Sequence, residues 1–237
     1  MLWWTLESTA IISNKSFLFI MKVFWLGHSC FLLRIKPGPS VLLDPFHGEE
    51  VGYPLPPVRA EIVTISHDHE DHNNAAGALG HPLIVRGPGR HSAWGLEIVG
   101  IPSCHDGEGG GLRGPNTIFC LDLKGIRVCH LGDLGHVLSR AQVQAIGPVD
   151  LLFLPVGGIY TLDAAGAGVV MEQLRPALTV PMHYRTEDLS FELDSVDSFL
   201  EGRRFCGPME CLELREDSLP GAGTVALLLR SADAADR

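Results

Sequence analysis

No two of the six cysteines in this chain of 237 residues stand in a C-x-x-C pair. A zinc site built from cysteine pairs is therefore not expected. Their even number does not argue for disulfides, because a chain of this length can bury a core that is stable without them. Their positions within apolar segments favour reduced, partly buried thiols in a cytoplasmic protein. The six are Cys30, Cys104, Cys120, Cys129, Cys206 and Cys211.

Positive charge is also scarce. The chain has 18 lysines and arginines against 28 aspartates and glutamates, so its formal net charge is −10. A protein with this charge repels phosphate backbones, and we expect no nucleic-acid partner. A small anionic substrate remains compatible with the composition, because bound divalent metal ions can reverse the local field.

A long apolar run is missing at the start of the chain. Glu7, Asn14 and Lys15 interrupt the first 20 residues, and no basic residue precedes them. These interruptions argue against a signal peptide, and a membrane-spanning helix would need about 20 mostly apolar residues in one run. We expect an extension over residues 1–20 and one domain over residues 21–237 that opens at Met21. The alternative is an extra strand or helix packed on the surface.

A G-x-S-x-G segment, which presents the serine nucleophile of many α/β hydrolases, is absent as well. What is present is an alternation of apolar runs with helical segments. Strands are predicted over 22–26, 30–35, 40–44, 61–66, 82–86, 117–123, 126–132, 151–155 and 224–229. Helices are predicted over 73–79, 139–146, 163–174 and 192–200. The order indicates an α/β fold with helices outside two packed sheets, and the glycine-rich residues 107–114 are expected to form a mobile surface loop.

The strongest signal is the run His67-Asp68-His69-Glu70-Asp71-His72, which follows a predicted buried strand. Side chains at positions i and i+2 of an extended segment point the same way, so His67 and His69 can share one metal ion. Asp71 and His72 then lie on a turn and can face a second ion. Imidazole and carboxylate ligands suit zinc, and also manganese, iron or nickel. The alternative is a solvated polar turn without a metal ion. Three histidines and an aspartate at these spacings would arise by chance in roughly one such sequence in a thousand.

This H-x-H-x-D-H run resembles the central motif of the metallo-β-lactamase superfamily, whose fold is an αββα four-layer sandwich of two mixed sheets. The resemblance implies later ligands after three further strands, and His105, Asp133 and His183 match them in order. By analogy, His67, His69 and His105 hold one divalent transition metal ion, and Asp71, His72 and His183 hold another. Asp133 bridges the two ions. The resemblance also gives Asp44 a role in hydrogen bonding to a ligand histidine.

A narrower resemblance concerns the opening segment Met21 to Cys30 and the segments 131–136 and 155–161. These resemble a compact subgroup of metal-dependent hydrolases related to L-ascorbate-6-phosphate lactonases. The likeness implies that His28 reaches the active site, as an extra ligand or a substrate contact. His136 and Thr161 are weaker candidates for the same role. The alternative for His28 is a histidine that only ends a strand.

These residues predict a hydrolase that activates water on two metal ions, with zinc as the first choice. Asp71 is the candidate catalytic residue, because its carboxylate can orient or deprotonate the nucleophile. We expect a small ester, lactone or phosphodiester substrate and no membrane partner, and the sequence is compatible with a homo-oligomer. A metal-binding or sensing protein without turnover and a nuclease are the alternatives.

Overall fold

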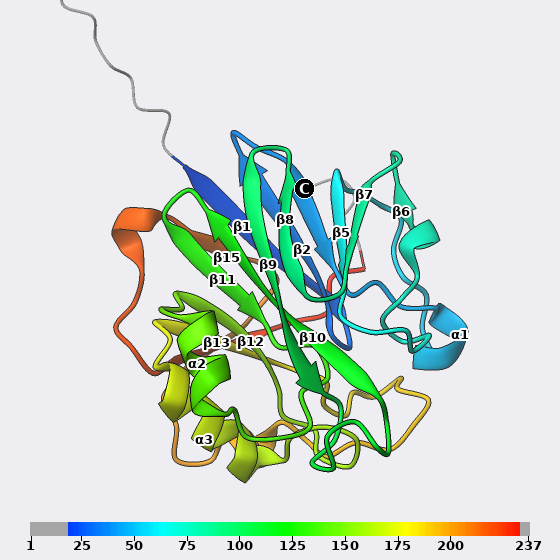
Figure 1. Ribbon diagram of the computed structural model, residues 1–237, viewed down its shortest axis with the longest axis vertical. Helices are drawn as coiled ribbons and strands as arrows, with labels where there is room; N and C mark the ends of the chain where they lie inside the picture. Colours follow the sequence, from blue (N-terminus) through cyan, green and yellow to red (C-terminus); the bar gives the residue numbers. More distant parts are fainter. Residues whose placement is uncertain (1–18, 233–237) are drawn as a thin grey trace, which may run out of the picture.

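Alternating burial along the first strands shows why two sheets pack together. In β1 (Ile20–Gly27), Met21, Val23 and Trp25 face one hydrophobic core, whereas Phe24 and Leu26 face a second one. A strand with period-two burial on both faces must be covered on both sides. The computed structural model describes residues 19–232. Figure 1 shows the two sheets packed face to face, and the side chains of the first core come from both of them. Residues 1–18 of the expected extension lie outside the described part of the chain.

The first sheet has six strands and contributes half of the site. Its order is β15-β1-β2-β3-β5-β7, with antiparallel pairing from β15 to β3 and parallel pairing from β3 to β7. The strands not yet given are β2 (Cys30–Lys36), β3 (Ser40–Leu43), β5 (Ile62–Ile65), β7 (Leu83–Arg86) and β15 (Leu212–Leu214).

The second sheet has eight strands in the order β14-β16-β13-β12-β11-β10-β9-β8. Pairing is parallel from β14 to β11 and antiparallel from β11 to β8. The strands are β8 (Gly89–Ala93), β9 (Leu96–Cys104), β10 (Pro115–Leu123), β11 (Ile126–His130), β12 (Leu151–Pro155), β13 (Leu178–Met182), β14 (Phe205–Met209) and β16 (Thr224–Leu228). A small separate pair joins β4 (Val58–Arg59) and β6 (Ala78–Leu79) in parallel.

The helices lie outside the sheets, as expected for the α/β sandwich. Figure 1 shows α2 (Arg140–Ile146) and α3 (Ala164–Leu174) together on one side and α1 (Gly48–Val51) on the opposite side. Ser139 caps α2 with a capping box, and Asp163 caps α3 by accepting from the Gly166 N–H, so both helices begin where the predicted ranges 139–146 and 163–174 begin. In the described chain no helix combines the length and the apolar character needed to cross a membrane.

Two predicted helices are wrong in extent. Over 73–79 only a 3-10 turn (Ala75–Gly77) forms, because Asn74 bonds to the Phe46 carbonyl and to the Gly77 N–H, and Ala78 then pairs with β4. Over 192–200 only α4 (Asp197–Leu200) forms, since the backbone N–H of Asp194 bonds to Gly157 across the fold. In both segments tertiary hydrogen bonds replace helical ones.

The glycine-rich loop over 107–114 is also more ordered than predicted. The buried carboxylate of Asp106 accepts four backbone N–H groups from this loop at 2.8 to 3.0 Å. The acceptor is charged, so these bonds are stronger than neutral ones and fix the path of the chain. The loop therefore places its last residues at a set position beside the neighbouring strand ends.

Candidate metal centre

All the candidate ligands follow the carboxyl ends of strands. Six strands from both sheets end near one point, and each is followed within three residues by a buried histidine or aspartate. Strand ends are where polar side chains can leave the sheet without breaking its hydrogen-bond ladder. The six pairs are β1 with His28, β3 with Asp44, β5 with His67, β9 with His105, β11 with Asp133 and β13 with His183.

Left-handed backbone at three of these strand ends turns the side chains towards the centre. His28, Asp44 and His183 have φ values of 50°, 43° and 52°. Non-glycine residues rarely adopt this conformation, which costs of order 1–3 kcal/mol where it is strained. Gly132, at φ 55°, makes a fourth such turn, and a Cβ there would clash with Asn116 Oδ1. The packing of the two sheets thus stabilises strained turns that direct these side chains towards the cluster of histidines and aspartates.

The first group of ligands is His67, His69 and His105. One ring nitrogen from each lies within 4.8 Å of the others, and His67 Nε2 is 3.1 Å from His69 Nδ1. The opposite nitrogens are held in place: His67 Nδ1 is 2.9 Å from Ser66 Oγ, and His105 Nδ1 is 3.1 Å from the Tyr160 carbonyl oxygen. A histidine fixed through one nitrogen presents the other to a metal ion in a defined orientation.

The second group is His28, Asp71, His72 and His183, with one ligand atom from each again within 4.8 Å of the others. Asp71 Oδ2 lies 3.1 Å from His28 Nε2 and 3.5 Å from His72 Nε2. His28 therefore lies with the second group, where its ring is a candidate for a fourth ligand.

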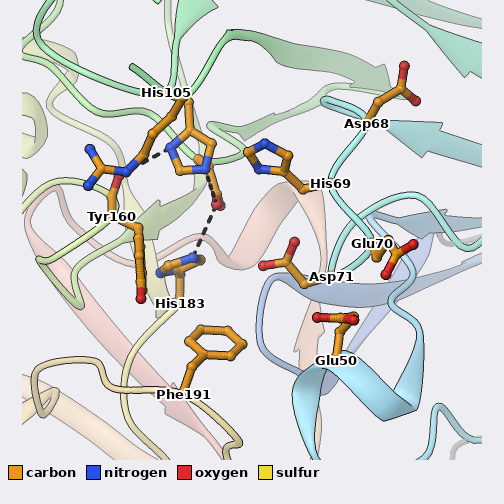
Figure 2. A pocket seen from close by; sticks show the side chains of 11 residues that line it. Glu50, Asp68, His69, Glu70, Asp71, His105, Tyr160, His183 and Phe191 are labelled. Carbon is orange, nitrogen blue, oxygen red and sulfur yellow. Dashed lines mark hydrogen bonds and ion pairs between the residues drawn. The ribbon is translucent and has the colours of Figure 1, made fainter.

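Asp133 lies between the two groups. Its Oδ2 is 3.0 Å from His105 Nε2 in the first group and 3.1 Å from His183 Nε2 in the second, while its Oδ1 is 3.1 Å from His72 Nε2. Figure 2 shows His105 and His183 converging on one carboxylate oxygen. The backbone N–H of Asp133 bonds to Asn116 Oδ1 at 3.1 Å, which fixes the turn. This is the position expected of a bridging ligand.

Asp44 lies fully buried behind the second group. It accepts hydrogen bonds from the backbone N–H and the hydroxyl of Ser66, and its Oδ2 is 2.9 Å from His72 Nδ1. His130, which the sequence analysis missed, lies 3.9 Å from the same oxygen and bonds through Nε2 to the Ser29 carbonyl. Asp44 orients the His72 ring so that its Nε2 faces the centre.

Burial keeps some of the histidines neutral. Desolvation, reinforced by His72, lowers the pKa of His67 to about 3. Desolvation, reinforced by His183, lowers the pKa of His28 to about 4. Neutral imidazole is the form that binds metal ions, so these two ligands are ready to bind at neutral pH.

For His72 and Asp133, neighbouring charges shift the pKa in the direction opposite to the effect of burial. Burial alone would lower the pKa of His72, but Asp133 and Asp71 outweigh it and hold that pKa well above its ordinary value. Burial would raise the pKa of Asp133, but His183 and His72 hold it well below its ordinary value. The carboxylates of Asp133 and Asp71 therefore favour positive charge at the centre, of the kind that a metal ion would supply.

The donor set fits divalent transition metal ions. His72 Nε2 and Asp133 Oδ1 are fully buried and face each other at 3.1 Å as an ion pair, and neither has a further hydrogen-bond partner within residues 19–232. Both atoms therefore keep capacity for a further partner, which a cation between them would satisfy. Nitrogen and carboxylate donors in two groups joined by one carboxylate suit a pair of ions such as zinc, manganese, iron or nickel.

Two weaker candidates lie elsewhere. The ring of His136 bonds to the backbone of Cys104 and Val137 and lines a different hollow, so its proposed role as an extra ligand is not supported. Thr161 does not line the cavity beside the centre, whereas its neighbour Tyr160 does. The side chain of Tyr160, and not the hydroxyl of Thr161, therefore faces the cavity.

An open cavity of about 560 Å³ adjoins the centre. Several residues around it escaped the sequence analysis, because no motif marks them and only the fold brings them together. The cavity is lined by Glu50, Asp68, His69, Glu70, Asp71, His105, Arg113, Asp133, Tyr160, His183 and Phe191. Its size admits a compact organic molecule with one end at the metal ligands.

Comparisons with known proteins agree with this geometry. The model of the beta-lactamase superfamily domain matches residues 22–183. A metal-dependent hydrolase of Thermoplasma acidophilum is 28% identical over 194 residues, which is 71% of this chain and 85% of the relative. Another, from Archaeoglobus fulgidus, is 29% identical over 196 residues, or 70% of this chain and 84% of the relative.

A solved structure shows the same fold. It is a crystal structure of a candidate zinc-dependent hydrolase of the metallo-β-lactamase superfamily from Thermotoga maritima. The two chains are 36% identical and superpose with a TM-score of 0.72, covering 88% of this chain and 100% of the other. The likeness extends through both sheets and beyond the ligand motif.

Proposed function

Because the chain is a metal-dependent hydrolase that belongs to the metallo-β-lactamase superfamily, we propose that it uses two divalent transition metal ions to hydrolyse a compact ester, lactone or phosphodiester. The observation that carries the proposal is Asp133, whose carboxylate touches histidines of both ligand groups within 3.1 Å. A single-metal site would not need a buried carboxylate shared in this way.

The two groups divide the ligands between the ions. His67, His69 and His105 hold the first ion. Asp71, His72 and His183 hold the second ion with His28 as a fourth ligand, and Asp133 bridges. When bound, such a pair lowers the pKa of water and polarises the electrophile. Zinc is our first choice, because a set dominated by imidazole with carboxylate suits it.

Asp71 is the residue we propose for handling the proton. It lines the cavity, and its side chain is 20% exposed, unlike the fully buried Asp133. His28 lies 3.1 Å from its Oδ2 and limits its rotation. An accessible carboxylate in a fixed orientation can position the attacking water and accept its proton. The cavity volume of about 560 Å³ favours a compact substrate.

The decisive experiment combines metal analysis with turnover. Purified wild-type protein is expected to hold two equivalents of zinc and to hydrolyse bis(4-nitrophenyl) phosphate or a simple lactone. His69→Ala removes one of three ligands from the first group, so zinc content falls towards one equivalent. We expect kcat/KM to fall by about 100-fold or more, beyond the effect typical of residues that only support a ligand.

His91→Ala is the matched control. His91 lies on β8 and bonds to the Gly87 carbonyl oxygen, away from the cavity lining. This variant should keep both zinc equivalents and full turnover. If His69→Ala kept two equivalents and wild-type activity, or if well-folded wild-type protein took up no metal, the proposed function would be wrong.

A further inference from the structure

The cavity beside the metal centre has two unlike walls. Figure 2 shows Glu50, Glu70 and Asp71 on one side and Tyr160 and Phe191 on the other, with the histidines between them. The first wall is anionic and the second is aromatic. A bound molecule must therefore present different chemistry to each wall.

The aromatic wall also carries the one cation. Among the described residues that line the cavity, Arg113 is the only lysine or arginine. Its guanidinium carbon lies 5.5 Å from the centre of the Tyr160 ring, and Nη2 donates to the Ile159 carbonyl at 3.2 Å. None of the ion pairs found within residues 19–232 involves Arg113. Most of its five donors are therefore free for a ligand.

Hydrogen bonds hold the backbone and the side chain of Arg113 beside the cavity. The backbone N–H of Arg113 donates to Asp106 Oδ2 at 2.8 Å, as one of the four bonds that order the glycine-rich loop. His105, a ligand of the first group, directly precedes Asp106 and bonds to the Tyr160 carbonyl oxygen. The backbone of Arg113 is thus held close to the first ligand group, and the contacts of its guanidinium with the Ile159 carbonyl and the Tyr160 ring keep that group on the aromatic wall.

We propose that Arg113 binds an anionic substituent, a carboxylate or a phosphate, on a substrate whose scissile bond lies at the metal centre. The inference rests on the proposed function and adds the substrate class. A planar guanidinium matches either anion through two parallel hydrogen bonds. Tyr160 and Phe191 cover the apolar part between the two ends. The acidic wall disfavours a second anionic substituent on its side, so the remaining groups of the substrate are neutral or cationic.

Equilibrium binding tests this assignment without requiring turnover. The probes are malonate, succinate and glutarate, each compared with its own monomethyl ester, on zinc-loaded protein by calorimetry. One carboxylate binds at the metal ions, and the second reaches Arg113 when the spacing is right. At the best spacing we expect wild-type protein to bind the diacid about tenfold or more tightly than its monoester. Arg113→Met should bind the two equally, and Arg113→Lys should keep part of the difference.

Arg90→Met is the matched control. Arg90 is exposed on β8 and does not line the cavity beside the centre, so its loss should leave the preference for the diacid unchanged. Equal binding of diacid and monoester by wild-type protein at every spacing would overturn the proposal. So would a preference that survives in Arg113→Met.

A probe that carries a phosphate distinguishes between the two anions. Phosphoglycolate replaces one carboxylate with a phosphate, and a larger loss of affinity in Arg113→Met for this probe than for the diacids would assign the pocket to phosphate. A larger loss for the diacids would assign it to carboxylate. Zinc analysis separates the two levels of failure. Wild-type protein without zinc overturns the function and the inference together, whereas fully loaded protein without discrimination overturns only the role of Arg113.

Discussion

The side chain that decides whether the second ligand group can bind a metal ion is Asp44, although it is not a proposed ligand. Its Oδ2 lies 2.9 Å from His72 Nδ1 and also accepts the Ser66 hydroxyl. An amide in place of the carboxylate would bring an N–H group close to one of these donors. The His72 ring would then lose the contact that directs its Nε2 towards the centre.

Asp44→Asn should therefore lower zinc affinity by about 10–100-fold, the usual effect of losing the partner of a ligand histidine. The measurement is competition with a coloured chelator, since it resolves tight binding. Asp150→Asn serves as the control, because Asp150 also accepts a backbone N–H, that of Arg127, but contacts no ligand. An affinity within twofold of wild type would show that Asp44 does not orient His72.

The raised pKa of His72 leads to a second expectation at this scale. In the metal-free protein this imidazole carries a proton at neutral pH, because Asp133 and Asp71 outweigh the effect of burial. A metal ion must displace that proton, so zinc affinity should rise with pH until the raised pKa of His72 is passed. His67 and His28 contribute no protons at pH 7, since burial lowers their pKa values to about 3 and about 4.

Calorimetry of zinc binding at pH 7 in buffers of different ionisation enthalpy measures this release. At least one proton should leave for each protein molecule that is filled. Zinc uptake with no proton release would mean that His72 is already neutral and that the carboxylates around it are weaker partners than their distances imply.

At the scale of elements, predictability follows the local signal. Four of the six strands followed by site residues were predicted, because their apolar runs stop abruptly at polar residues, as at Ile65, whereas β9 and β13 were not among the predicted strands. The hairpin of β8 and β9 was missed, because β8 is largely exposed and polar and β9 contains Gly100 and Pro102. The left-handed turns were not foreseen either. Histidine and aspartate adopt positive φ more often than most residues, but this local signal is too weak to predict such a turn, since tertiary packing imposes it.

In the loop over 107–114 the local signal is present but misleading. Its glycines predicted mobility, whereas Asp106 orders it through four backbone bonds, which lower the pKa of the carboxyl to about 2. Asp106→Asn keeps one acceptor oxygen and turns an amide nitrogen towards two N–H donors. Hydrogen exchange at residues 108–113 should become about tenfold faster or more, with β10 unaffected as an internal control.

The pH dependence of this effect has a definite sign. Because the pKa of Asp106 is lower in the folded chain than its ordinary value of 3.8, its stabilisation is complete above that value and is lost as the pH falls towards about 2. The difference in thermal midpoint between wild type and Asp106→Asn should therefore be constant from pH 7 to 5 and shrink below pH 4. A difference that does not change with pH would assign the effect to something other than the charged carboxylate.

For the whole molecule, the centre is a junction between the two sheets. His28, His67 and His72 follow strands of the six-stranded sheet, whereas His105, Asp133 and His183 follow strands of the eight-stranded sheet. Each proposed ion takes ligands from both. Bound metal therefore links two layers that otherwise meet through apolar packing and a few hydrogen bonds such as that of His130 to Ser29, and it binds the folded chain in preference to the unfolded one.

Metal removal should consequently lower the thermal stability of the entire domain. One ion at a free concentration 100 times its Kd stabilises the folded state by about 2.7 kcal/mol. For a domain of this size that corresponds to a rise in Tm of roughly 5–10 °C for each ion. Protein stripped with a chelator and titrated with zinc should show this rise by scanning calorimetry, as one shift of a single transition. His69→Ala should show about half of it, because only its second group remains intact. If one sheet melted at the same temperature with and without zinc while the other shifted, the metal ions would belong to that sheet alone and would not join the two.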